Sequence, residues 1–241
     1  MDSLFIPVLA LLPVMALIIY ICWLDRCSPE PPSKLMLAFF AGAISSVVSL
    51  FISIPFGLMG LYSEETVCVT DGIRMAFFGA AIPEEVAKLL MLWLAVRKNK
   101  YFDERMDGIV YAVCVSLGFA GAENLLYLFS NGDDYMTVGI SRALFAVPGH
   151  FCFGVLMGYY YSLVSFSSRS TFKDKAFVLL APIAAHGIYD SILLISEATP
   201  LAGGLLLILF LLFFRRMWKI GSRKIREHLE KDAEPTREEH F

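Results

Sequence analysis

The order of apolar and polar positions along the chain predicts a bundle of membrane-spanning helices. Runs of about 20 apolar residues, the length of helix that crosses roughly 30 Å of hydrocarbon, recur through most of the sequence. Six are clear, at residues 4–24, 35–56, 73–96, 108–129, 143–164 and 176–196. A seventh, at 199–218, has a shorter uncharged part. We include it because Arg215 and Arg216 can extend to the membrane surface while Trp218 lies at the interface.

Composition agrees with this pattern. Hydrophobic residues make up 57% of the chain and charged residues 18%, and the mean hydropathy is +0.65. These values are far from those of a soluble domain. The expected fold is therefore all-α, a polytopic transmembrane bundle of about seven spans. We expect a membrane domain, 1–218, followed by a charged cytoplasmic tail, 219–241, and a multi-pass location in a cell membrane, that of the bacterial plasma membrane.

The distribution of basic residues predicts the orientation of the bundle. In a seven-span arrangement, one side carries 17 of the Lys and Arg residues and the other side only Arg74 and Arg142. Because basic loops stay in the cytoplasm, the N-terminus is expected outside and the C-terminus inside. The basic start of the tail is expected to lie on anionic lipid, although a solvated tail that merely fixes the topology explains the same charges. We expect no nucleic-acid partner.

Three charges interrupt the third predicted span. Glu84, Glu85 and Lys88 lie in the middle of the apolar stretch from Met75 to Val96. One Glu or Lys at the bilayer centre costs roughly 2.5 to 3.5 kcal/mol of insertion free energy. A sequence that keeps three such residues therefore indicates a functional site within the membrane.

Four more ionisable residues lie inside predicted spans: Glu123, His150, His186 and Asp190. Counting about 1.5 Å per helical residue from the predicted ends puts all of them, and Glu84, between the midplane and the outer third of the membrane. Three prolines stand close to these residues: Pro83, Pro148 and Pro182. Because proline tends to kink or break a helix, we expect irregular backbone around a buried cavity.

The spacing of these residues predicts which of them share a helical face. Glu84 and Lys88 are four residues apart, which permits an ion pair along one helix, whereas Glu85 points about 100° away. His186 and Asp190 are also four residues apart, so the carboxylate can orient the imidazole. A carboxylate near a lysine and two imidazoles is a plausible general base for activating water. Taken singly, each element also has a structural explanation, as a buried ion pair, a hydrogen-bonded core histidine or an interhelical clamp.

Four ordered motifs resemble those of the PrsW family of intramembrane proteases. They are EExxK at Glu84, Glu85 and Lys88, FxxxEN at Phe119 to Asn124, HxxxG at His150 and Gly154, and HxxxD at His186 and Asp190. The pairs Asp25-Arg26 and Glu30-Pro31 are also similar, so the resemblance covers about residues 25 to 190. In the related CAAX prenyl endopeptidases the first motif is typically EExxxR and the second ends in His. Lys88 and Glu123 depart from that pattern and favour the PrsW branch.

The resemblance implies hydrolysis of a peptide bond in a membrane-anchored regulatory protein, such as an anti-sigma factor, near the extracytoplasmic side. Glu84 would activate the water molecule, Glu85 would be a second catalytic carboxylate and Lys88 their charge partner. Glu123, His150 and His186 would bind the water or a metal and stabilise the oxyanion, and Asp190 would orient His186.

The sequence leaves the metal and two other functions open. Glu123, His150 and His186 are candidate ligands of a zinc ion, but a glutamate-activated water without metal fits the same residues. A proton-coupled transporter or channel also places Glu, Lys and His at the midplane, although the repeat symmetry typical of transporters is not found. A bis-histidine haem site at His150 and His186 would leave the carboxylates unexplained. A non-catalytic scaffold is the remaining alternative.

Overall fold

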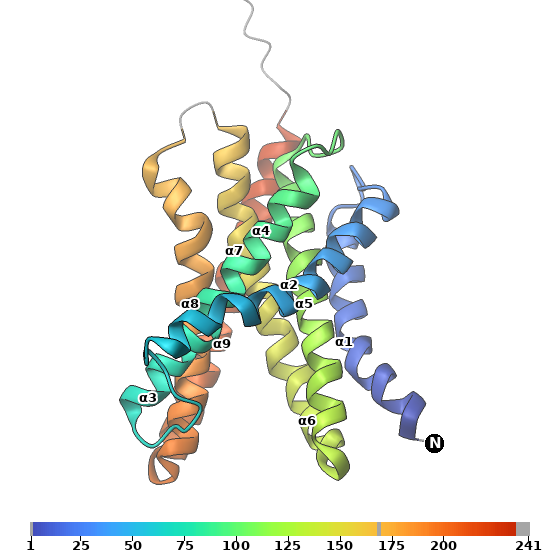
Figure 1. Ribbon diagram of the computed structural model, residues 1–241. Helices are drawn as coiled ribbons and strands as arrows, with labels where there is room; N and C mark the ends of the chain where they lie inside the picture. The colour runs from blue at the N-terminus through green and yellow to red at the C-terminus, as the bar shows by residue number, and fades with distance from the viewer. Residues whose placement is uncertain (1, 168–169, 235–241) are drawn as a thin grey trace, which may run out of the picture.

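The computed structural model describes residues 2–167 and 170–234, and within these residues all regular secondary structure is helical (Figure 1). The α-helices are α1 (Asp2–Leu24), α2 (Pro32–Leu58), α3 (Val69–Arg74), α4 (Ile82–Val96), α5 (Arg105–Ser130), α6 (Tyr135–Ser141), α7 (Val147–Phe166), α8 (Phe172–Ala198) and α9 (Gly203–Ala233). Short π-helical and 3-10 segments join some of them: η1 (Met75–Ala81), η2 (Gly132–Asp134), η3 (Arg142–Ala146) and η4 (Pro200–Ala202). The expected all-α class is confirmed.

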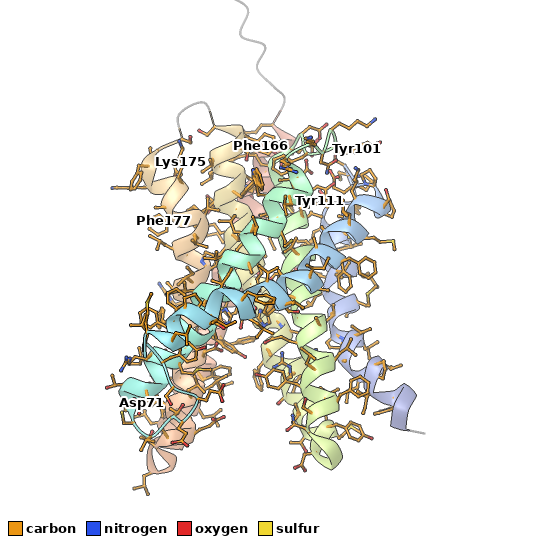
Figure 2. All side chains as sticks on the ribbon, in the orientation of Figure 1. Asp71, Tyr101, Tyr111, Phe166, Lys175 and Phe177 are labelled. Atoms are coloured by element: carbon orange, nitrogen blue, oxygen red, sulfur yellow. The ribbon has the colours of Figure 1, made fainter. Side chains whose placement is uncertain are left out.

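The helices run alternately up and down the bundle. In Figure 1, α1 starts at the marked N-terminus at the bottom and ends at the top, α2 returns, and the continuous run from α3 through η1 into α4 rises again. α5 then descends, α6 and α7 rise, α8 descends and α9 rises to the top. Figure 2 shows Tyr101, Phe166 and Lys175 near the top and Asp71 near the bottom. The first and last described helical ends therefore lie at opposite ends of the bundle.

In the part of the chain that the structure describes, five helical stretches are long and apolar enough to cross a membrane: Phe5–Leu24, Pro32–Leu58, Arg105–Ser130, Tyr135–Phe166 and Phe172–Ala198. They contain or closely match five of the seven predicted spans. The other two predicted spans are also helical, but both carry charged residues. These are Glu84, Glu85 and Lys88 in α4, and Arg215 and Arg216 near the end of the last predicted span in α9.

Helix α5 is the centre of the bundle. Every residue from Met106 to Gly121 on it is buried, because α1, α2, α4, α7 and α9 all pack around it. A helix that is covered on all sides has no polar face, and α5 shows little difference in hydrophobicity around its circumference. The position of α5 in the bundle is consequently fixed by packing on every side along this stretch.

Two glycines let α2 cross α5 at close range. A β-carbon on Gly42 of α2 would lie 1.9 Å from the carbonyl oxygen of Val115, and one on Gly118 of α5 would lie 1.9 Å from that of Phe39. No side chain fits at such distances. Small residues at crossings of this kind let membrane helices approach each other closely, and here they bring α2 and α5 into backbone contact.

The predicted boundary at residue 218 does not coincide with the end of a helix. Helix α9 continues to Ala233 and packs against α5 and α7. Asp232 accepts hydrogen bonds from the backbone N–H groups of Arg105 and Met106 at 3.2 and 2.8 Å. These N–H groups at the start of α5 have no acceptor within their own helix. His228 is fully buried and stacks on Tyr159 at 4.4 Å between ring centres. Residues 219–233 are thus part of the bundle rather than a separate tail, and 235–241 lie outside the described residues.

Replacing Gly42 with alanine is expected to lower the free energy of unfolding by about 1–3 kcal/mol, the usual cost of overpacking. Helix propensity alone favours alanine over glycine by about 1 kcal/mol, so a loss of stability can come only from the crossing. Gly204→Ala is the matched control, because a β-carbon there meets nothing within 4 Å. Unfolding in detergent measures both, and equal stability of the two variants would contradict the assigned role of Gly42.

Candidate active site

Two prolines of the site follow π-helical segments. Pro83 is the second residue of α4, directly after η1, and Pro148 is the second residue of α7, directly after η3. The wider π turn accommodates a residue that has no backbone N–H, and single π turns are frequent at functional sites. The irregular backbone expected at these positions is present. At Pro182 it is not, because α8 runs unbroken from Phe172 to Ala198.

The ammonium group of Lys88 lies at the centre of the site. Its Nζ is 2.8 Å from Oε1 of Glu85, 3.3 Å from Oε2 of Glu84 and 3.1 Å from Nδ1 of His150. It also lies 4.0 Å from the ring centre of Phe119. The ion pair with Glu84 expected from the sequence is present, but the contact with Glu85, three residues away on the helix, is shorter. Glu85 therefore does not point away from Lys88.

The contact with Lys88 determines the tautomer of His150. An ammonium group donates hydrogen bonds and accepts none, so Nδ1 of His150 is the acceptor, and the hydrogen-bond network assigns the ring proton to Nε2. Nε2 lies 3.1 Å from Oε2 of Glu123 and donates to it. Helices α4, α7 and α5 are thereby joined through one imidazole ring.

His186 on α8 lies between carboxylates on both sides. Its Nδ1 is 2.9 Å from Oε1 of Glu85, and its Nε2 is 3.1 Å from Oδ2 of Asp190 and 3.8 Å from Oε2 of Glu84. The ring also stacks on Phe153 at 4.5 Å between centres. The expected contact of His186 with Asp190 is present, and Glu85 fixes the opposite side of the ring.

Arg142 belongs to this cluster, although the sequence suggested only an external loop residue. Its Nη2 donates to Oε2 of Glu123 at 2.8 Å and its Nε donates to Oδ1 of Asn124 at 2.6 Å. Charge counting used Arg142 as a topology signal, and no spacing rule connects it to Glu123, 19 positions earlier. The structure makes the connection because α6, which ends directly before Arg142, packs against α5.

The site residues fall into two sets, according to whether they line a cavity of about 580 Å³. Those that line it include Glu84, Glu123, Arg142, His150, His186 and Asp190. Glu85 and Lys88 do not line it, and their side chains are 0% and 1% exposed. Asn131 and Glu197, at the ends of α5 and α8, also line the cavity. It therefore extends toward the end of the bundle that holds Asp71 in Figure 2.

The donor atoms of the site fit a divalent metal ion. Two groups have ligand atoms within 4.8 Å of one another, Glu84 with Glu123 and His150, and Glu84 with Glu85 and His186. The predicted ligands Glu123, His150 and His186 thus fall into two groups that share Glu84. Four carboxylates face two permanent cations here, and Oε2 of Glu85 is buried without a hydrogen-bond partner. Carboxylate oxygen and imidazole nitrogen are ligands that zinc takes.

The other residues of the resemblance, Asp25 and Glu30, lie at the opposite end of the bundle. Tyr111 of α5 donates a hydrogen bond to Glu30 and accepts one of 2.7 Å from Asn99. Burial and the nearby Glu30 and Glu104 carboxylates raise the pKa of Asp25 to about 7. These residues fasten the connection between α1 and α2 to α5 and do not reach the cavity.

Comparison with known proteins decides the family of this chain. A family model described as PrsW family intramembrane metalloprotease matches residues 30–217. The chain belongs to this PrsW family. It is 33% identical to Protease PrsW of Clostridioides difficile (strain 630), over 92% of this chain and 90% of that protein. It is also 33% identical to the Bacillus subtilis (strain 168) protein of the same name, over 89% and 91% of the two chains. No solved structure matches.

Membership in the PrsW family confirms the expected activity, an intramembrane peptidase in a multi-pass membrane protein. The family is one of metalloproteases, which agrees with the acidic and histidine groups around Glu84. The transporter alternative is not favoured by these matches.

Replacing Lys88 with methionine is expected to lower the free energy of unfolding of this PrsW protein by about 3–5 kcal/mol, because the change leaves the buried Glu85 carboxylate without its cation. The double variant Glu85→Gln/Lys88→Met should recover much of that loss, since it removes both charges. Unfolding by SDS titration in mixed micelles measures the two variants. If the double variant is as unstable as the single one, packing rather than charge explains the effect.

Proposed function

We propose that the cavity between α4, α5, α7 and α8 is the active site, where a peptide bond of a membrane-anchored regulatory protein is cut. An anti-sigma factor is a protein of this kind. One observation carries the proposal: Glu84 lines the cavity with its carboxylate beside both Lys88 and His186. A carboxylate held by a cation at the wall of a polar cavity within the bundle is equipped to activate water.

Glu84 is the general base in this proposal. Its carboxylate takes a proton from a water molecule, whose oxygen attacks the carbonyl carbon of the scissile bond. The proton then passes to the nitrogen of the leaving amine as the carbon–nitrogen bond breaks. Lys88, 3.3 Å away, stabilises the negative charge of Glu84 before the transfer.

Glu85 acts differently from its neighbour. It is fully buried, and its Oε1 atom lies 2.8 Å from Nζ of Lys88 and 2.9 Å from Nδ1 of His186. We therefore assign it a positioning role, in which it fixes the ring of His186, with Asp190 on the other nitrogen. Groups behind the first layer orient the residues that react.

Glu123, His150 and His186 also line the cavity. The Nε2–H group of His150, now directed at Glu123, is a donor for negative charge that develops on the carbonyl oxygen. Preorganised donors of this kind are worth about 10²–10³ in kcat. Glu123 holds this donor in place until substrate arrives.

A zinc ion would be held by Glu84 together with one of its two partner pairs, Glu123 and His150 or Glu85 and His186. In the first pair, Nε2 of His150 would have to give up the proton that it donates to Glu123, because a nitrogen ligand must be deprotonated. A bound zinc supplies Lewis-acid polarisation of the carbonyl group and lowers the pKa of a bound water molecule. The choice between the partner pairs determines which histidine is a ligand. Water activation by Glu84 without metal uses the same residues.

The orientation of the protein follows from its basic residues. We propose that all seven helical passes cross the membrane, with the N-terminus outside and the end of α9 in the cytoplasm. The connections at the top of Figure 1 and the C-terminal part of α9 together carry most of the Lys and Arg residues, as cytoplasmic segments do. The cavity then extends toward the extracytoplasmic side, which is the side expected for the cut.

We also propose that anionic lipid contacts the basic part of α9. Five basic residues between positions 215 and 226 are exposed: Arg215, Arg216, Lys219, Arg223 and Arg226. Each basic residue near an anionic membrane surface contributes about 1 kcal/mol. Lys224 is not in this set because it is only partly exposed, with its Nζ 3.1 Å from Glu227.

Glu84→Gln is expected to abolish cleavage while leaving the protein folded and abundant, because glutamine has a similar shape but cannot take a proton. The measurement is co-expression with candidate membrane-anchored regulators and detection of the cut fragment. Glu64→Gln is a matched control on an exposed loop residue and should cleave like the wild type. A fragment of equal amount from wild type, Glu84→Gln and His186→Ala would exclude these residues from catalysis.

Metal analysis of the purified protein is expected to find about one zinc ion per chain, lost together with activity on chelation and regained with zinc. Glu84→Gln should lose the metal under either ligand set. His150→Ala and His186→Ala then separate the sets, since each should abolish binding only where its ring is a ligand. Full activity of demonstrably metal-free protein would leave the glutamate-activated water as the mechanism.

A further inference from the structure

The wall of the cavity is rich in acceptors and poor in strong donors. Four carboxylates line it, those of Glu84, Glu123, Asp190 and Glu197. Arg142 is the one lysine or arginine on this wall among the residues that the structure describes. The rest of the wall is largely apolar, so a peptide that enters the cavity meets four carboxylates and Arg142 as the charged side chain of opposite sign.

The guanidinium group of Arg142 is held from three directions. Nη2 donates to Glu123 and Nε donates to Asn124, while the group lies 4.2 Å from the ring centre of Tyr127. Asn124 is itself fixed, because its amide donates to the carbonyl oxygen of Ala10 on α1 at 2.9 Å. Among the described residues, Nη1 has no hydrogen-bond partner. A rigid guanidinium with one uncommitted nitrogen at a cavity wall is preorganised for a ligand.

A substrate within the membrane needs such a donor. Cleavage requires an extended stretch of main chain, and unwinding a helix frees carbonyl oxygens that find no water in the hydrocarbon core. A buried carbonyl without a donor costs about 1–3 kcal/mol. Carboxylates cannot satisfy it, because they only accept hydrogen bonds.

Distances put Arg142 within reach of the chain beside the scissile bond. Ligand atoms of Glu84, Glu123 and His150 lie within 4.8 Å of one another, and Arg142 is 2.8 Å from Glu123. One residue of extended chain spans about 3.3–3.6 Å. If Glu84 activates the water, a carbonyl group next to the cut bond falls beside Arg142.

We propose that Arg142 is a substrate-binding residue whose Nη1 donates a hydrogen bond to a main-chain carbonyl oxygen next to the scissile bond. Nη2 and Nε hold the guanidinium on Glu123 and Asn124 meanwhile. This inference rests on the proposed function. A role in charge balance or topology alone would need only a positive charge at this position. Substrate binding needs the planar guanidinium group, whose separate N–H donors contact Glu123, Asn124 and the substrate at the same time.

The experiment compares Arg142→Lys and Arg142→Ala with the wild type in steady-state cleavage of a membrane peptide in detergent or liposomes. Both variants should raise KM by about 10–100-fold, the value of a charge-assisted hydrogen bond, with a much smaller change in kcat. A higher KM with an unchanged kcat is the pattern expected when the lost contact was equally strong in the ground state and the transition state. Added guanidinium should partly restore Arg142→Ala. Glu84→Gln, assayed in parallel, should lose kcat instead.

Substrates with an ester in place of a single amide test the contact directly. The ester carbonyl is a weaker acceptor, so at one position beside the scissile bond it should raise KM for the wild type but not raise it further for Arg142→Ala. Arg74→Lys is the matched control, since Arg74 holds the carbonyl oxygens of Leu61 and Gly60 and does not line the cavity. It should respond to the ester as the wild type does.

Three results would overturn the proposal. They are wild-type KM in Arg142→Lys, an ester effect that is equal in wild type and Arg142→Ala at every position, and a loss of activity that follows thermal stability and is not rescued by guanidinium. If Glu84→Gln still cleaves, the proposed active site itself is wrong. If Glu84→Gln is inactive and Arg142→Lys is normal, only the role of Arg142 is wrong.

Discussion

An ammonium group buried between apolar helices needs an acceptor for each of its protons, and the site is organised by that need at Lys88. Its three contacts, to Glu84, Glu85 and His150, match the three N–H groups of a lysine. One of them crosses to α7 and so fixes how α4 lies against that helix. Because Nδ1 of His150 must accept, its Nε2–H must donate, and Glu123 on α5 becomes its partner. The protonation pattern across three helices follows from one buried cation.

Backbone packing makes this network possible. Helix α5 reaches its neighbours at backbone distance, through Gly42 and Gly118 at the crossing with α2. Helices packed this tightly cannot slide to relieve a poor hydrogen bond, so Glu123 has a fixed position relative to His150. The π-helical segments η1 and η3 are local departures from regular α-helix beside the site, since each widens the helix just before Pro83 or Pro148.

The sequence predicted the parts of the site that depend on the free-energy cost of a charge in lipid and on residue spacing within one helix. The cost of a charge in lipid identified Glu84, Glu85 and Lys88, and the four-residue spacing identified the contact between His186 and Asp190. It could not predict contacts between helices, because these depend on rotation and depth to within a few ångströms. Arg142 is the clearest case, since its partner Glu123 lies 19 positions away. For the same reason it could not predict that His150 and His186 belong to different groups of ligand atoms around Glu84.

The adjacent glutamates explain how one helix serves two requirements at once. Consecutive residues on a helix point about 100° apart, so the two carboxylates approach Lys88 and His186 from different sides of α4 and differ in their exposure. Glu85 turns into the protein, where Lys88 and His186 surround it, and is 0% exposed. Glu84 turns toward the cavity and keeps 13% of its side chain exposed. One carboxylate stabilises the buried lysine and orients a histidine, and this leaves the other able to meet water. The two positions are therefore not equivalent, and exchanging their roles would require rotating the whole of α4.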